Sequence, residues 1–468
     1  MINIYVYFIC ILAIGCSQTG TTTIAPGRYS GASVLYTFDN TPNDYYGAYH
    51  ASPVNNPTYV SPGYNGRGYA IQLRRSLSQY LSVPTYMNFY RRSLTVEAWL
   101  YPLTIYSASP YDDTLIYGQT NASTFSLYMW MMLRNGRSYG AFHSNDVSGP
   151  TVFRENQWQH LAFTYDFATT TQTVYYNGVV GNYIFLFYFI LHCCNIFLDG
   201  INSNAPPCLI TVGMQAIGRY PQSAGGFFDG YLDQISILFN RAKTAAEILA
   251  DATLVAKYTM DCLSYISWDS GPNQIHGTTY GLSTGDGGRL GQSYLFNSAL
   301  SYFQASGFVL LGQPYRPYSF SLWLRPIITT NGTIIHVSSQ TDGRGWCLSF
   351  LGFNTAGQIV TMSWNGTGGA PTVVGPTLTA GQWTHIGITY TQAGRLVLYV
   401  NGASVGQTGV YTYLANNNPV SITLGNHLNG STCANNGIQR AQYYGHIDEF
   451  QVFSREITAA EFLAFANP

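Results

Sequence analysis

Charged side chains are scarce in this sequence. Asp, Glu, Lys and Arg make up 9% of the 468 residues, against about 25% in an average soluble protein. The 20 basic and 21 acidic residues nearly cancel, and no Lys or Arg cluster is present that could follow a phosphate backbone. The composition therefore argues against nucleic acid as a partner and predicts a surface of neutral polar groups.

A run long enough to cross a membrane is also missing. A membrane-spanning helix needs about 20 apolar residues, and the longest apolar run, Tyr183 to Leu198, has 16 and contains His, Cys and Asn. The run follows a predicted hairpin, so a membrane crossing there would have to return at once to the same sheet. The sequence therefore predicts a chain that does not span a membrane.

The first residues are apolar and are followed by small side chains at Gly15 and Ser17, which predicts a secretory signal peptide over residues 1–17. A bacterial lipoprotein signal acylated at Cys16 is the alternative. Sequons for N-glycosylation agree with a secreted, extracellular protein. They begin at Asn121, Asn331, Asn365 and Asn429.

The sequence contains an internal repeat. Four landmarks recur in the same order in its two halves, which indicates a tandem duplication. The matching pairs are residues 93–102 with 318–326, 156–166 with 381–391, 173–178 with 397–402, and the stretches that begin at Phe228 and Tyr443. We therefore expect two domains, 28–252 and 253–468.

Each repeat reads mainly as strands. Apolar residues alternate in "LTVEAWL" (94–100) and "HIGITY" (385–390), the period of a half-buried strand. Asn177-Gly178 and Asn401-Gly402 predict type I′ hairpins. Thr-Ala-Ala-Glu sequences at 244–247 and 458–461 predict a capping box and a short helix at the C-terminal end of each repeat. The sequence thus predicts an all-β fold of two antiparallel sandwiches, each with one short helix.

These landmarks resemble the laminin-G-like, concanavalin-A-like jelly-roll family of extracellular proteins. The resemblance rests on the "SLTVEAWLYP" and "FSLWLRP" strands, the hairpins ending in "YYNG" and "YVNG", and the closing "GYLDQISI" and "GHIDEFQVF". It implies two jelly rolls, but it is a weak guide to the ligand, because this fold serves lectins, adhesion modules, protein-binding domains and some glycoside hydrolases.

Tryptophan and histidine recur at matching positions of the two repeats. We expect the tryptophans to fill the space between the two sheets of each sandwich, and each histidine to satisfy a nearby backbone group. A metal or catalytic histidine is the alternative, but no second His or Cys lies at ligand spacing. The residues are Trp99, Trp158, Trp323, Trp383, His160 and His385.

The sequence predicts a protein that is not an enzyme. No H-E-x-x-H or P-loop sequence is present, and no E-x-D-x-E pattern places the two carboxylates of a retaining glycosidase on one strand. Glu97 is the one acid on a predicted core strand, and its counterpart in the second repeat is Ser321.

Aspartates occupy equivalent places in both repeats. Asp233 and Asp448 lie on the closing strand, which we expect near the first strand with Asp39 or Asp261. In similar jelly rolls an Asp of the closing strand, helped by backbone carbonyls, holds a structural Ca²⁺. We therefore predict a structural calcium site, the alternative being an Asp that hydrogen-bonds a turn.

Loops rich in Tyr, Asn, Asp and Gln suit sugar faces, and protein partners equally. We predict Tyr45, Tyr46, Tyr443 and Tyr444 as ligand-binding residues; packing of these rings on their own domain is the alternative. The loops are residues 41–50, 106–113 and 427–444.

Four cysteines lie outside the signal peptide and the apolar run: Cys208, Cys262, Cys347 and Cys433. In a secreted chain they indicate two disulfides, with three connectivities open. We favour Cys347 with Cys433, because the first repeat has no Cys at either equivalent position, which leaves Cys208 with Cys262.

The apolar run interrupts the first repeat at about residues 182–198. We hypothesise that it is a translated intron, because the codons of Gly181 and of residues 197–199 can supply a GT donor, a pyrimidine tract and an AG acceptor. Splicing would restore an in-frame "YYNGVVDGINSN". Sequencing the transcript across Val180 to Gly200 tests this hypothesis, and a cDNA that keeps the run would contradict it.

Together these observations predict a secreted, non-catalytic protein that binds a glycan or an extracellular protein through tandem laminin-G-like domains. A structural adhesion or matrix component without a ligand pocket, and a diverged glycoside hydrolase, are the alternatives.

Overall fold

The computed structural model describes residues 33–89, 92–105, 113–121, 128–142, 145–185, 213–221, 225–285, 287–366, 370–391 and 393–468. Two compact units divide the chain between residues 253 and 254. We call Gly31–Thr253 the first jelly roll and Leu254–Pro468 the second jelly roll. The signal peptide predicted over residues 1–17 lies outside the described residues.

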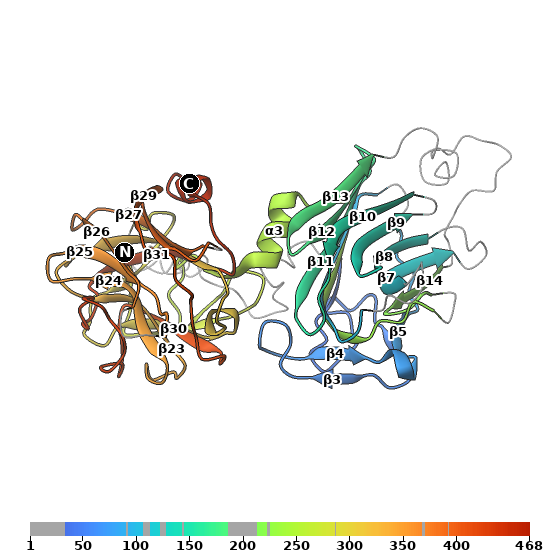
Figure 1. Cartoon of the computed structure of the whole chain (residues 1–468), viewed down its shortest axis with the longest axis horizontal. Helices are drawn as coiled ribbons and strands as arrows, with labels where there is room; N and C mark the ends of the chain where they lie inside the picture. The colour runs from blue at the N-terminus through green and yellow to red at the C-terminus, as the bar shows by residue number, and fades with distance from the viewer. Residues whose placement is uncertain are drawn as a thin grey trace, which may run out of the picture. The chain divides into compact units, whose positions relative to one another are not determined.

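The first jelly roll is built from two antiparallel sheets, which form separate layers in Figure 1. Sheet A runs β13 (Val179–Phe185), β12 (Thr171–Tyr176), β11 (Gln159–Asp166), β6 (Leu94–Pro102), β15 (Gly230–Phe239), β4 (Ala70–Leu73) and β3 (Thr58–Val60), with β1 (Val34–Tyr36) on β15. Sheet B runs β10 (Asn145–Val152), β9 (Arg137–Phe142), β8 (Tyr128–Arg134), β7 (Asp113–Asn121), β14 (Gly213–Ile217), β5 (Tyr80–Val83) and β2 (Ser52–Val54).

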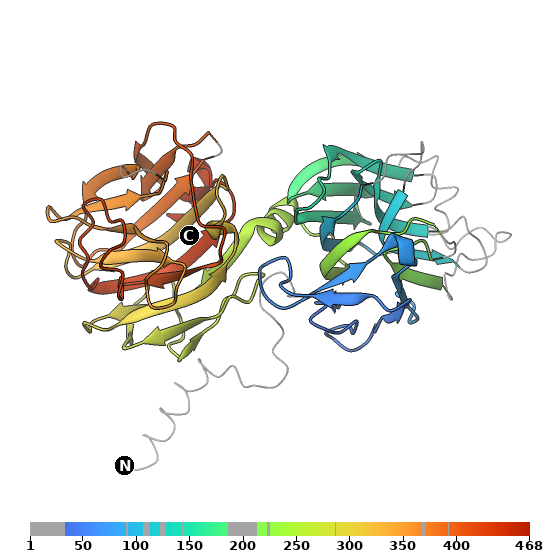
Figure 2. The ribbon, with the colours of Figure 1, turned by 60° about the horizontal axis from the view of Figure 1, so that its bottom comes forward.

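The second jelly roll, yellow to red in Figure 2, has the same layering. Sheet C runs β19 (Ser283–Gly285), β20 (Ser293–Phe296), β31 (Gly445–Phe453), β22 (Tyr318–Pro326), β27 (Thr384–Tyr390), β28 (Leu396–Val400) and β29 (Ala403–Gln407), with β16 (Leu254–Tyr258) on β31. Sheet D runs β17 (Ile266–Ser267), β18 (Gly277–Tyr280), β21 (Tyr302–Phe308), β30 (Val420–Leu424), β23 (Thr333–Ser338), β24 (Cys347–Phe353), β25 (Gln358–Met362) and β26 (Thr372–Thr377).

The helices form where the capping boxes predict them. Helix α3 spans Ala245–Thr253 and helix α4 spans Ala459–Phe465; the 3₁₀ turns η1 (Arg75–Leu77) and η2 (Leu310–Gly312) are the other helical elements described. At the start of α4, Thr458 Oγ1 accepts from the Glu461 amide, and Glu461 accepts from the Thr458 amide at 2.9 Å. These reciprocal bonds satisfy amides that the first turn leaves open, which explains why the helix begins there.

The core of each jelly roll lies between its two sheets. The alternating residues of β6, from Leu94 to Leu100, belong to the first core, and Ile386, Ile388 and Tyr390 of β27 belong to the second. Because successive side chains of a strand point to opposite faces, the intervening residues of β6 and β27 lie on the outer faces of sheets A and C. Those outer faces carry the polar groups discussed below.

The two predicted hairpins have the backbone that type I′ turns require. Asn177 and Gly178 have φ values of 48° and 80°, and Asn401 and Gly402 have 48° and 79°. The apolar run begins within the first hairpin, because β13 pairs with β12 as far as Phe185. The rest of the predicted insertion lies outside the described residues, among which no helix is long and apolar enough to cross a membrane.

Candidate functional site

The aspartates of the two closing strands hold loops through backbone amides. Asp233 Oδ2 accepts from the Tyr64 amide at 2.9 Å, and Asp448 Oδ2 accepts from the Arg289 and Leu290 amides at 2.7 and 3.0 Å. Burial outweighs these hydrogen bonds and raises the pKa of Asp448 to about 7. The loop before β4 and the loop before β20 are thus anchored in the same way in the two repeats.

Asp39 and Asp261 repeat this pattern further along the same loops. They accept from the amides of Tyr69 and Gln292, each at 2.9 Å. These contacts are those expected of the alternative to a calcium site, in which each Asp hydrogen-bonds a turn. Within the described ranges no three His, Cys, Asp or Glu side chains are grouped as metal ligands would be, and the calcium site stays a prediction.

The predicted ligand-binding tyrosines differ in exposure. Tyr45 is 49% exposed and Tyr46 is half-buried, and their rings meet edge to face with centroids 5.4 Å apart. Tyr444 is half-buried. Tyr443 is 0% exposed and donates from its hydroxyl to the His446 carbonyl at 3.0 Å. The prediction for Tyr443 is wrong, because this ring belongs to the core of the second jelly roll.

Cys347 and Cys433 form a disulfide, the pairing that the sequence favours. Cys262 is also disulfide-bonded. Cys208 lies outside the described residues, so its pairing with Cys262 stays a prediction.

The placement predicted for the tryptophans is wrong. Trp99 lies opposite His160 and Asp233 on the outer face of sheet A, and it is not part of the core cluster that holds Ala98 and Leu100. Trp323 lies opposite His385 and Asp448 in the same way on sheet C. Trp158 and Trp383 contact outer-face residues too: the Tyr101 ring, and the guanidinium of Arg325, whose carbon lies 5.1 Å from the centroid of the Trp383 ring.

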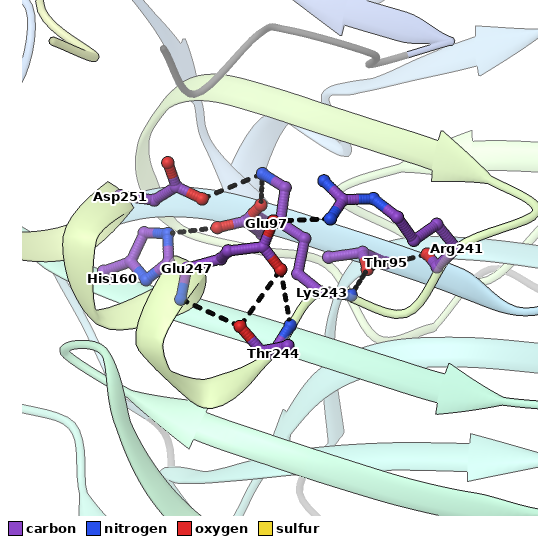
Figure 3. A network of polar contacts seen from close by, with 8 residues as sticks. All are labelled: Thr95, Glu97, His160, Arg241, Lys243, Thr244, Glu247 and Asp251. Atoms are coloured by element: carbon purple, nitrogen blue, oxygen red, sulfur yellow. Dashed lines mark hydrogen bonds and ion pairs between the residues drawn. The ribbon is translucent and has the colours of Figure 1, made fainter. Parts of the chain in front are cut away.

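The outer face of sheet A holds a buried ionic network beneath helix α3 (Figure 3). Lys243 Nζ lies 2.5 Å from Glu97 Oε1 and 2.8 Å from Asp251 Oδ2, and His160 Nε2 lies 3.3 Å from Glu97 Oε2. Burial opposes the charge of Lys243, but the two carboxylates outweigh it and raise the pKa of Lys243. The histidine thus faces a side-chain carboxylate, not the backbone group that we predicted.

The second jelly roll lacks this network. Ser321 takes the place of Glu97, and its hydroxyl lies 2.9 Å from His385 Nε2. Ile457 and Phe465 stand at the positions of Lys243 and Asp251. Burial lowers the pKa of His385 to about 4, so this histidine is neutral at pH 7. Because the second repeat has apolar residues at the positions of Lys243 and Asp251, the ionic network fits a structural role better than a catalytic one.

The outer face of sheet B carries a second group of side chains that sequence reasoning missed, which we call the aromatic cluster: Tyr128, Trp130, Tyr139 and Tyr220. Tyr128 stacks on Trp130 with centroids 3.7 Å apart, and Trp130 lies 4.6 Å from the Tyr220 ring. Trp130 Nε1 is buried and, among the described residues, has no hydrogen-bond partner. The alternation in "YMWMMLR", with Met129, Met131 and Leu133 in the core, is the signal that places Trp130 on the outer face.

Charged groups hold the aromatic cluster in place. Arg134 contacts both carboxylate oxygens of Asp113, at 2.6 and 2.7 Å, and its guanidinium carbon lies 4.1 Å from the centroid of the Tyr139 ring. The Tyr139 hydroxyl donates to Asp146, and the Tyr220 hydroxyl donates to Asp113. Hydrogen bonds to Asp113 raise the pKa of Arg134. The aromatic cluster therefore rests on a charged frame of one guanidinium and two carboxylates.

The equivalent face of sheet D is covered by the segment 426–442. The segment is tied down by the disulfide at Cys433, and a Cβ added at Gly430 would come within 2.8 Å of the His336 ring. His336 is fully buried, its Nε2 lies 2.9 Å from the Gly343 carbonyl, and burial lowers its pKa to about 4. Among the described residues, the part of this face beneath the segment has no counterpart of the aromatic cluster.

Three Gly-x-Ser-x-Gly sequences occur, at 136–140, 281–285 and 402–406. In hydrolases such a sequence exposes a nucleophilic serine on a strand-to-helix turn. Here Ser138 lies within β9, Ser283 within β19 and Ser404 within β29, so none of the three serines is on such a turn.

Comparison with known proteins identifies the family. The sequence model described as the concanavalin A-like lectin/glucanases superfamily matches residues 75–182 and 273–462. No curated protein matches the chain.

Three solved structures are among those similar to this chain. Domain 4 of the extracellular arabinanase AbnA from Geobacillus stearothermophilus is 20% identical, with 46% of this chain and 98% of that chain covered and a TM-score of 0.32. The binding domain of Paraclostridial Mosquitocidal Protein 1 is 19% identical, with 47% and 52% covered and a TM-score of 0.35. Domains LG4-5 of the mouse laminin alpha1 chain are 16% identical, with 86% and 94% covered and a TM-score of 0.26. The match thus spans about half the length of the mosquitocidal binding domain, and nearly all of the laminin pair.

The family model covers more than half of the chain and falls in both jelly rolls, and the chain therefore belongs to the concanavalin A-like lectin/glucanases superfamily.

Proposed function

We propose that this protein is a secreted, non-catalytic binding protein that recognises a glycan through the aromatic cluster of its first jelly roll. The observation that carries the proposal is the stacked pair of Tyr128 and Trp130, two half-buried rings whose centroids lie 3.7 Å apart on the outer face of sheet B. Half-buried rings keep part of their apolar surface available to the C–H face of a sugar. The disulfide between Cys347 and Cys433 supports an oxidising, extracellular location.

The composition of the aromatic cluster favours a sugar over an ionic ligand. Tyrosine and tryptophan rings present apolar faces to the C–H face of a sugar, with hydroxyl and N–H groups at their edges. Arg134 is already paired with Asp113 and lies close to Asp146, so the charged frame offers no unpaired positive charge to an anionic ligand. An extracellular protein partner is the second candidate, because exposed Tyr and Trp also suit protein interfaces.

The carboxylates support a binding role over hydrolysis. A retaining glycosidase needs one carboxylate as nucleophile and another as acid/base, about 5 Å apart across the scissile bond. Asp113 is bound by Arg134 and Tyr220, and Asp146 is bound by Tyr139. Such bonds fit carboxylates that position the cluster.

We retain a structural Ca²⁺ bound near Asp39 and Asp233, or near Asp261 and Asp448, as part of the proposal. The support is chemical: carboxylate oxygens recur at the same two loops of both repeats, and Ca²⁺ prefers oxygen ligands.

A glycan array tests the proposed function. The full chain is compared with Trp130→Ala and Trp130→Phe, in Ca²⁺ and again in EDTA. We expect Trp130→Ala to weaken binding tenfold or more, which corresponds to a loss of about 1.4 kcal/mol or more of binding free energy. Trp130→Phe should fall between the two, because it keeps a ring and loses the N–H.

Thermal melting of each variant is the control for folding. Binding by folded Trp130→Ala that equals the wild type, or an array with no bound glycan, would contradict the proposed function. Loss of binding in EDTA alone would place a calcium ion near the site.

A further inference from the structure

Aromatic side chains gather in the second jelly roll at the edge of sheet D. Tyr265 is 64% exposed, Tyr280 is 38% exposed, and Tyr302 is half-buried beside them. Ile266 and Trp268, on and just after β17, are 45% and 43% exposed. We call these five residues the tyrosine patch. Single exposed apolar residues are common, but a contiguous group of this kind marks an interaction site.

Three neighbouring segments place the tyrosine rings in one row. Tyr280 and Tyr302 are directly opposite in the pairing of β18 with β21, and their rings stack with centroids 4.5 Å apart. Tyr265 precedes β17, and its ring meets Tyr280 edge to face at 5.9 Å with the two hydroxyl oxygens 3.3 Å apart. The pairing fixes Tyr280 and Tyr302 on one side of the sheet, and the hydroxyls form a polar edge beside apolar rings.

The fold of this family does not require the tyrosine patch. In the first jelly roll Tyr80 stands at the position of Tyr302, because the residues that follow them, Leu81 and Phe303, have equivalent partners in Ile217 and Leu424. There the guanidinium of Arg219 lies over the Tyr80 ring at 4.2 Å. The described part of sheet B ends at β2, with no strand in the place of β17. The exposed row is therefore a feature of the second jelly roll alone.

The tyrosine patch and the segments that carry it are uncharged. Residues 262–268, 276–285 and 298–315 contain no Asp, Glu, Lys or Arg. A charged ligand would lose hydration here and gain no counter-charge. The neighbouring polar groups are neutral: Thr278 and Gln304 are opposite one another on the same side of the sheet as Tyr280 and Tyr302, and both are half-buried. Rings, hydroxyls and an amide without charge complement a neutral polyol.

We propose that the tyrosine patch is a second, independent binding site that takes a neutral glycan, with sugar rings packed against Tyr265 and Tyr280. The inference goes beyond the proposed function, because it needs neither the first jelly roll nor the aromatic cluster. With a site on each jelly roll the chain binds a repeating polysaccharide at two points, which strengthens binding by raising the effective concentration of the second contact.

Binding of uncharged oligosaccharides and of immobilised neutral polysaccharide to the full chain tests the inference. The variants are Trp130→Ala, Tyr265→Ala/Tyr280→Ala, and all three changes together. Tyr315→Ala is the matched control, because Tyr315 is a 71% exposed tyrosine of the same jelly roll outside the tyrosine patch. Melting temperatures verify that each variant folds.

We expect Tyr265→Ala/Tyr280→Ala to weaken binding of at least one neutral oligosaccharide about tenfold or more, with Tyr315→Ala unchanged and the loss also seen in the Trp130→Ala background. Unchanged binding of neutral sugars by Tyr265→Ala/Tyr280→Ala would overturn the inference, as would an equal loss in Tyr315→Ala or a loss confined to charged glycans or to a protein. If Trp130→Ala alone removes all glycan binding, the inference fails and the proposed function stands. If only Tyr265→Ala/Tyr280→Ala removes glycan binding, the proposed site at the aromatic cluster fails and the inference stands.

Discussion

Replacing Lys243 by Ile should lower the free energy of unfolding of the first jelly roll by about 3–5 kcal/mol, since removing one partner of a buried ion pair leaves the other charge uncompensated. Glu97 is 0% exposed, and Lys243 Nζ lies 2.5 Å from one of its carboxylate oxygens. The same amine holds Asp251 of helix α3 at 2.8 Å. Loss of the amine therefore leaves the buried Glu97 carboxylate on β6 without its cation and removes a contact that holds helix α3.

The second jelly roll provides the matched rescue. At the positions of Glu97, Lys243 and Asp251 it has Ser321, Ile457 and Phe465. The triple variant Glu97→Ser/Lys243→Ile/Asp251→Phe therefore gives the first jelly roll the residues of the second. Replacing a buried ionic group by packed apolar residues is often neutral or stabilising, and we expect the triple variant to recover most of the loss. Urea unfolding measures both variants.

Lys257→Ile is the control, because the Lys257–Glu449 pair is partly exposed at the lysine and should cost at most about 1 kcal/mol. A loss below about 1 kcal/mol for Lys243→Ile would contradict the buried-network account.

The sequence predicts the strands and turns because each depends on neighbouring residues. Alternation along β6 and β27 identifies the core-facing side, since a strand has a side-chain period of two. The Asn-Gly hairpins and the capping boxes are equally local, and the structure confirms both. The repeat then extends these inferences from one jelly roll to the other.

The misplaced tryptophans show where an expectation about residue type misleads. The alternation that puts Ala98 and Leu100 in the core puts Trp99 on the opposite face. The prediction placed Trp99 in the core all the same, because large aromatic rings are common there. On the outer face Trp99 is covered by the Tyr64 ring, 4.3 Å away and stacked. Tyr64 comes from a loop that Asp233 anchors, and no local pattern reveals that contact.

The aromatic cluster is partly readable from sequence. Alternation within β8 places Trp130 and Arg134 on one face, but Tyr220 comes from a loop 90 residues further along the chain and Asp113 from β7. Only the sheet pairing brings these residues together. Tyr443 likewise packs against Phe296 and Phe353, which are distant in the sequence, so no local periodicity reveals its burial.

Removing the disulfide by Cys347→Ser/Cys433→Ser should lower the free energy of unfolding of the second jelly roll by about 3–4 kcal/mol. The cysteines are 86 residues apart, and closing a loop of that length in the unfolded chain accounts for about 4–5 kcal/mol in the chain-entropy model, of which real disulfides often deliver less. The segment 426–442 loses its tie at the same time, so we expect faster proteolysis within it. The unfolding transition of the first jelly roll is the internal control and should not move. If the second transition also stays in place, the covering of sheet D depends instead on the other contacts of the segment, such as the Ser349 amide donating to the Ala434 carbonyl at 3.0 Å.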